Sequence, residues 1–163
     1  MRIRKHINFR RFVVVIYVGF FLVFLATGLR PADAVTYDLD GTLFIPSINL
    51  KSDVARLTVE NHKLNTPDTI VGSYSRADNK TLLIGHSTTV FVDLDDLRVG
   101  EDIFYHDKSY SIVDMVVMDK TDISMNELLK ESSEDTLMIM TCAGEDLGGG
   151  NYTKRLIVTA ISS

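Results

Sequence analysis

An apolar segment near the N terminus divides this chain into two unequal parts. Residues Phe12 to Leu29 form an uninterrupted run of 18 apolar or small residues. As a helix this run would be about 27 Å long, close to the thickness of a bilayer's hydrocarbon core. It follows five basic residues and no acidic one, which predicts a cytoplasmic N terminus. We therefore predict a cytoplasmic basic segment (1–11), a single transmembrane signal-anchor helix (12–29) and an extracellular remainder; the basic residues are Arg2, Arg4, Lys5, Arg10 and Arg11.

A cleaved signal peptide is the alternative for this segment. Ala32-Asp33-Ala34 offers an A-x-A cleavage pattern. The apolar run is longer than the roughly 7 to 15 residues of a typical signal-peptide core, so we favour a retained anchor. The chain ends at Ser163, directly after its last apolar run, so we expect no second span.

The external part is strongly acidic. From Pro31 to Ser163 the chain carries 11 Lys and Arg against all 22 Asp and Glu, which gives a net charge of 11 − 22 = −11. This charge argues against nucleic acid as a partner. The length suffices for one sizeable core, and the single cysteine cannot form an internal disulfide, so packing must stabilise the domain.

The pattern of the external part is that of a mainly β protein. After a short stalk (30–41), we predict a barrel domain over residues 42–163. Strands are expected at 42–50, 55–59, 81–86, 103–106, 110–118, 136–142 and 155–161, with a hairpin turn at Lys108-Ser109 and a long polar connection over 61–80. We also expect a helical turn over 91–97 and a short helix to Lys130, begun by a capping box of Ser124 and Glu127. About seven or eight short strands with one or two short helices predict a small closed barrel.

Three residue types with complementary chemistry stand at strand ends. Cys142, the only cysteine, closes the apolar run from Thr136 to Thr141. A thiol nucleophile needs a proton partner, and His86 ends another apolar run, directly after Gly85. A thiol of ordinary proton affinity is mostly protonated at neutral pH, and an acidic domain disfavours the thiolate further. A fixed cation is the simplest remedy, and Arg155 is the candidate.

Each of these residues also has a purely structural interpretation. Cys142 can be a buried structural thiol, His86 a hydrogen-bonded strand-end residue and Arg155 a solvated edge charge. Three other histidines compete for the role of base. Neither His62 nor His106 follows a glycine at a strand end, and His6 lies on the cytoplasmic side of the predicted anchor.

Two further segments bear on ligands. The loop over 143–154 contains Gly148-Gly149-Gly150, so it is either a connection at the barrel rim or a flap beside the site. It lacks the Lys and Ser spacing of a phosphate-binding loop, so we reject nucleotide binding. The acids Asp93, Asp95 and Asp96 are either calcium ligands or exposed charges. We predict no metal and no cofactor.

Four segments carry a combined pattern: Ile45-Pro46-Ser47-Ile48, Ile84-Gly85-His86, Met138-Ile139-Met140-Thr141-Cys142 and Lys154 to Ala160. Taken together, they resemble segments of sortases, the membrane-bound cysteine transpeptidases. The resemblance covers roughly Thr42 to Ser163. Met138 and Ile139 depart from the Thr and Leu that the family carries there.

The resemblance implies both roles and partners. Cys142, His86 and Arg155 would be catalytic, and Thr141 would bind substrate. The enzyme would cleave a Leu-Pro-x-Thr-Gly-like sorting signal of surface proteins and transfer the acyl group to an amine of the cell wall or of a pilin. A short stalk and the absence of a C-terminal span favour the wall-anchoring subclass. A membrane-anchored cysteine protease, with water as acceptor, and a non-enzymatic surface-binding barrel remain as alternatives.

Overall fold

The computed structural model describes residues 36–60 and 63–163, of which Tyr37 to Ser163 form one compact unit. The predicted basic segment, the predicted transmembrane helix and the first half of the predicted stalk (30–35) lie outside the described residues, as does His62. Within the described part, no helix is long and apolar enough to cross a membrane.

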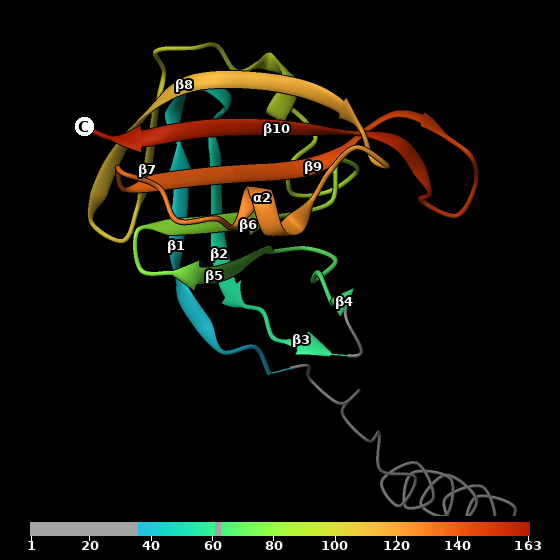
Figure 1. Ribbon diagram of the computed structural model, residues 1–163, viewed down its shortest axis with the longest axis horizontal. Coiled ribbons are helices and arrows are strands. Elements are labelled where there is room, and N and C mark those ends of the chain that lie inside the picture. The colour runs from blue at the N-terminus through green and yellow to red at the C-terminus, as the bar shows by residue number, and fades with distance from the viewer. Residues whose placement is uncertain (1–35, 61–62) are drawn as a thin grey trace, which may run out of the picture. The chain divides into compact units, whose positions relative to one another are not determined.

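Eight strands close into a barrel in the order β1-β2-β5-β6-β9-β10-β8-β7 (Figure 1). A separate two-stranded sheet, β3-β4, lies between β2 and β5 in the chain. This architecture confirms the predicted mainly β, closed barrel with few short helices. The elements are β1 (Leu39–Ile45), η1 (Pro46–Ile48), β2 (Leu50–Arg56), β3 (Val59–Glu60), β4 (Lys63–Leu64), β5 (Val71–Ala77), β6 (Lys80–Ile84), η2 (Leu94–Asp96), β7 (Asp102–Tyr105), β8 (Lys108–Asp119), α2 (Met125–Leu128), β9 (Thr136–Asp146) and β10 (Tyr152–Ser162).

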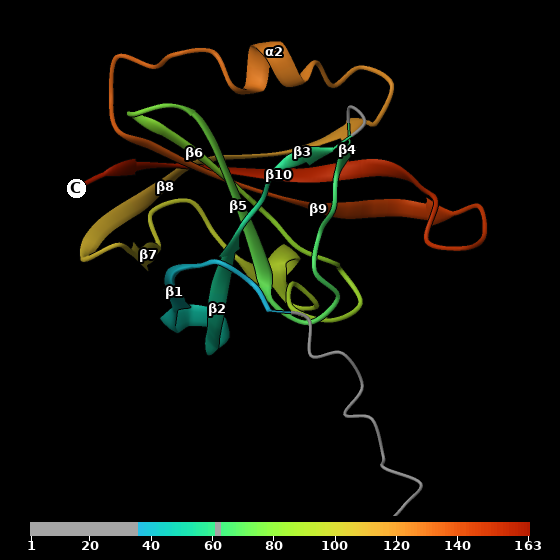
Figure 2. The same ribbon diagram turned by 90° about the horizontal axis from the view of Figure 1, so that it is seen from below.

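Strand β9 is apolar on both faces because both faces are covered. Leu137 and Ile139 point into the barrel core, whereas Met138 belongs to a second cluster on the outside of the wall. Leu129, just after α2, packs on this outer cluster, and Figure 2 shows α2 lying outside the barrel wall. A strand buried on both sides reads as a continuous apolar run, which is how it appears in the sequence.

The structure differs from the prediction near the start of the barrel, where Pro46 interrupts a predicted strand. The predicted strand over 42–50 is two strands, because Pro46 has no amide proton to donate to a ladder and instead begins η1. Asn49 then adopts a left-handed conformation, with φ 50°, and β2 follows. The predicted strand over 55–59 is wrong because β2 already ends at Arg56, and β1 begins at Leu39, inside the predicted stalk.

Four other predicted features differ from the structure. The polar connection over 61–80 contains β4 and β5; in β5, Ser73 is buried, whereas Ser75 and Arg76 are exposed. The hairpin turn falls at His106-Asp107, both with positive φ, rather than at Lys108-Ser109. Ser124 makes no side-chain cap to α2, which spans a single turn. The predicted loop over 143–154 narrows to five residues, 147–151, because β9 and β10 continue beyond the barrel wall as a hairpin (Figure 1).

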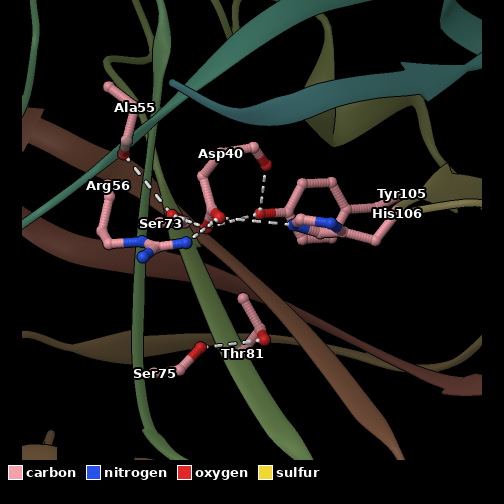
Figure 3. Close-up of polar contacts among 8 residues, drawn as sticks. All are labelled: Asp40, Ala55, Arg56, Ser73, Ser75, Thr81, Tyr105 and His106. Carbon is pink, nitrogen blue, oxygen red and sulfur yellow. Dashed lines mark hydrogen bonds and ion pairs between the residues drawn. The ribbon is translucent and has the colours of Figure 1, made fainter. Parts of the chain in front are cut away.

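A carboxylate on β1 ties four strands together (Figure 3). Asp40 accepts a hydrogen bond of 2.6 Å from Ser73 Oγ on β5 and one of 3.0 Å from the Tyr105 hydroxyl on β7. It also forms an ion pair of 2.6 Å with Arg56 of β2, and His106 Nε2 lies 3.6 Å from it. Burial alone would raise the pKa of Asp40, but the bonds from Ser73, Arg56 and Tyr105 outweigh burial and lower it.

This lowered pKa links stability to pH. Because the folded-state pKa of Asp40 lies below its unfolded value, its contribution is present above about pH 4 and is lost as pH falls through the folded pKa. We expect Asp40→Asn to reduce the free energy of unfolding at pH 7 by about 2 kcal/mol, since a charge-assisted hydrogen bond is lost. The difference from the unaltered protein should shrink towards pH 3.

Urea unfolding at several pH values, followed by tyrosine fluorescence, measures this effect. Asp114→Asn is the matched control, because Asp114 is an exposed carboxylate on β8. A deficit for Asp40→Asn that is equally large at pH 3 and pH 7 would show that the charge of Asp40 contributes nothing.

Candidate active site

The strand register aligns the three predicted catalytic residues. In the antiparallel β9-β10 pair, Cys142 lies directly opposite Arg155. In the parallel β6-β9 pair, Ile84 lies beside Met140, so two residues further along each chain His86 comes level with Cys142. Because side chains of a strand alternate between its faces, residues two apart share a face. The register therefore places the side chains of His86, Cys142 and Arg155 in one row on the outer face of the sheet formed by β6, β9 and β10.

A glycine is needed where β6 ends. The Gly85 amide donates to the Met140 carbonyl at 3.4 Å, which extends the pairing by one residue. A Cβ on Gly85 would lie 2.5 Å from Val90 Cγ1 and 2.6 Å from the ring of Phe91, which is buried. The His86 carbonyl then accepts from the amides of Thr89 and Phe91, at 3.3 and 3.0 Å. This tight turn leaves the His86 side chain 42% exposed at the strand end.

Thr141 fixes β9 to this turn. Its side chain is buried, and Oγ1 donates a hydrogen bond of 2.8 Å to the Gly85 carbonyl. The bond therefore joins the residue before the thiol to the residue before the imidazole. The substrate-binding role predicted for Thr141 stays a prediction; its hydroxyl is engaged in positioning the two strand ends.

The row of three borders a groove of about 320 Å³. Cys142 is a free, half-buried thiol there. Arg155 Nη1 donates to the carbonyls of Tyr152, at 3.2 Å, and Lys154, at 2.7 Å, which anchors the guanidinium against its own strand. Apolar side chains form most of the remaining wall; they include Leu64, Ile84, Met125 and Met140.

Sequence reasoning missed several groove residues. Leu64 and Thr66 belong to the stretch that we predicted as a polar connection, and Met125 comes from α2. Asp68 was also missed: its carboxylate lies 3.9 Å from His86 Nε2 but is 96% exposed, so its attraction to an imidazolium is strongly screened by water. No spacing in the sequence relates these segments to Cys142, because tertiary packing alone brings them there.

The competing candidates that lie within the described residues do not line the groove. His106 does not line the groove and lies beside Asp40 instead. Asp95 and Asp96 lie in η2, next to Asp93. Within residues 36–60 and 63–163, no three His, Cys, Asp or Glu side chains come together in a way that would hold a metal ion.

Comparison with known proteins identifies the family. The sortase domain model matches residues 43–162. Sortase C from Clostridium perfringens SM101 superposes with a TM-score of 0.59 at 24% identity, over 77% of this chain and 70% of that one. For sortase A from Listeria monocytogenes the TM-score is 0.61 at 17% identity, over 77% and 88% of the two chains. Sortase C-1 from Actinomyces oris superposes with a TM-score of 0.60 at 21% identity, over 77% of this chain and 72% of that one. Among curated proteins none matches.

The match to the family model spans nearly the whole barrel. The chain therefore belongs to the sortase family, the cysteine transpeptidases.

Proposed function

We propose that this chain is a sortase-type transpeptidase that cleaves a Leu-Pro-x-Thr-Gly-like sorting signal through a thioacyl intermediate on Cys142. It then transfers the acyl group to an amine of the cell wall or of another surface protein. The observation that supports this proposal best is the groove in which Cys142, His86 and Arg155 occupy one row, beside an apolar wall. Such a wall suits an extended peptide with apolar side chains.

Acylation needs a thiolate and an acid. The Cys142 thiolate attacks the scissile carbonyl and forms a C–S bond, and His86 in its imidazolium form donates a proton to the departing amine. The C–N bond breaks, and a thioester with neutral His86 remains. In the second half, an acceptor amine attacks the thioester, His86 takes its proton, and the thiolate leaves.

Arg155 supplies the positive charge of the site. Because its guanidinium stays protonated at every accessible pH, it favours the thiolate over the neutral thiol. It also has donors left to bind the oxyanion of the tetrahedral intermediate, since Nη1 alone takes part in the bonds to the carbonyls of β10.

The acceptor distinguishes the proposal from its alternatives. A cysteine protease with the same residues would use water, and a binding barrel would form no thioester. We favour the cell wall over a pilin as acceptor because the stalk predicted over 30–41 is short for an N-terminal lid.

We expect Cys142→Ala to abolish turnover of a sorting-signal peptide while leaving the fold intact, because alanine nearly fits the volume of the side chain and only the nucleophile is lost. Mass spectrometry of the unaltered protein should show an acyl adduct on Cys142, and added amine should convert that adduct into a new amide. Turnover by Cys142→Ala near the rate of the unaltered protein would rule out the thiol. Release of free acid alone, at any amine concentration, would favour the protease.

The role of Arg155 can be tested by a pair of variants. Arg155→Lys keeps the charge but loses the forked donors, so kcat/KM should fall by roughly 10 to 1,000-fold if the guanidinium binds the oxyanion. For Arg155→Ala, kcat/KM should fall further. If Arg155 only stabilises the thiolate, lysine should restore most of the activity, whereas alanine should shift alkylation of Cys142 by iodoacetamide to higher pH. Peptide turnover by both variants at the rate of the unaltered protein would show that Arg155 is a surface charge.

We further propose that the protein is a single-pass membrane protein with its catalytic domain outside the cell. The apolar run from Phe12 to Leu29 and the basic residues before it support this topology. External protease should therefore reach the domain in intact cells, and the protein should remain in the membrane fraction. A mature N terminus at Val35, found by sequencing the cellular protein, would contradict the retained anchor.

A further inference from the structure

A β-bulge interrupts the β9-β10 pair where the hairpin leaves the barrel wall (Figure 1). Two residues of β9, Gly144 and Glu145, lie there opposite a single residue of β10, Thr153. An extra residue in one strand bends the pair and increases its local twist. The bulge lies only two positions along each strand from Cys142 and Arg155, which are paired with each other. It is therefore the first irregularity next to the aligned site.

The bulge requires a glycine at position 144. The φ of Gly144 is 77°, in the left-handed region that residues with a Cβ rarely adopt. A Cβ there would also lie 2.6 Å from Thr153 Oγ1 and 3.0 Å from Lys154 Cγ. Thr153 is itself fixed, because Oγ1 accepts a hydrogen bond of 3.1 Å from the Glu145 amide and the carbonyl accepts one of 3.0 Å from the Lys120 amide. A side chain at position 144 would therefore change the bulge itself.

The same bulge shapes the segment that holds Arg155. Arg155 Nη1 donates to the carbonyls of Tyr152 and Lys154, at 3.2 and 2.7 Å. These two acceptors are the residues on either side of Thr153, the residue that lies opposite the bulge. Without the extra residue in β9, the two strands would follow a different path at this point. The position of the guanidinium beside Cys142 therefore depends on the bulge.

We propose that this bulge orients the Arg155 guanidinium for the chemistry at Cys142, and that Gly144 and Thr153 are positioning residues for the reaction. The inference rests on the proposed function. Nη1 has two N–H groups and two acceptors on β10, which leaves the N–H groups of Nε and Nη2 for the oxyanion of the tetrahedral intermediate. A displacement of about 1 Å in a group that binds a transition state can lower the rate by about 100-fold.

Other glycines of the same hairpin lie away from side chains. Gly148 and Gly149 also have positive φ, of 104° and 66°, but a Cβ on either would meet no atom within 4 Å. An alanine at Gly149 and an alanine at Gly144 would thus share the cost of the left-handed conformation. Disruption of the bulge would follow only from the alanine at Gly144. Gly149→Ala is therefore the matched control.

A double-mutant cycle tests whether Gly144 acts through Arg155. The full-length protein in detergent carries Gly144→Ala, Arg155→Lys or both, and kcat and KM for a sorting-signal peptide are measured with saturating amine. Arg155→Lys removes Nη1 but keeps a charge. With Arg155 present, Gly144→Ala should lower kcat by roughly 10 to 100-fold at unchanged KM, because the lost interaction belongs to the transition state. With Lys at position 155, the same substitution should change kcat by less than about two-fold. Gly149→Ala should change kcat by less than about two-fold in either background.

A second pair of variants avoids a new side chain at position 144. Thr153→Val keeps the shape of the side chain but cannot accept the bond from the Glu145 amide, whereas Thr153→Ser keeps the hydroxyl. Valine is well tolerated in strands, so the fold should persist. We expect Thr153→Val to lower kcat by roughly 3 to 10-fold, and only when Arg155 is present. Thr153→Ser should keep most of the activity. This pair gives the answer even if Gly144→Ala fails to fold.

The outcomes distinguish this inference from the function on which it rests. Equal losses from Gly144→Ala or Thr153→Val with and without Arg155 would overturn the inference, because they would reflect a general effect on the fold. Unchanged kcat in both variants would overturn it too, as would full activity of Arg155→Lys alone. In each of these cases an acyl adduct on Cys142 would leave the proposed function intact. No adduct on Cys142 in the unaltered protein would overturn the proposed function, and with it the inference.

Discussion

The site depends on one feature of the sheet: β9 pairs with β6 in parallel and with β10 in antiparallel register. These two pairings bring together residues that are 56 and 13 positions from Cys142 in the chain. A slip of one residue in either pairing would turn His86 or Arg155 to the other face of the sheet. The register is held by core side chains such as Leu137 and Ile139, and at the site itself by the buried bond from Thr141 to the Gly85 carbonyl.

The polar groups that stabilise the fold differ from those that would carry out the chemistry. The Asp40 side chain is 14% exposed, with three donors around its carboxylate, and it joins β1, β2, β5 and β7. Cys142 and His86 are only partly buried and lie at strand ends. A carboxylate surrounded by donors stays charged and immobile, which suits a structural bond, whereas catalytic groups must gain and lose protons and contact a substrate.

The sequence predicts the barrel and its central strands well, for a physical reason. Strands β6, β9 and β10 are apolar because they are covered, so their positions are visible in hydropathy alone. Strand β5 was missed because Ser73, Ser75 and Arg76 make it look like a loop; Ser73 is in fact buried, with its hydroxyl bound to Asp40. The turn at His106-Asp107 was missed because its backbone conformation is usually adopted by Gly or Asn.

The candidate site likewise has a part that the sequence predicts and a part that it does not. Cys142, His86 and Arg155 are recognisable because each stands at the end of an apolar run, where few other residue types could be reactive. Leu64 and Met125 come from the small sheet β3-β4 and from a helix of one turn, and their positions depend on packing across the barrel surface. The reactive groups are thus local to three adjacent strands, whereas much of the groove wall that would choose a peptide is built from distant segments. Substitutions in those segments can change the choice of substrate without disturbing the register that aligns the thiol, the imidazole and the guanidinium.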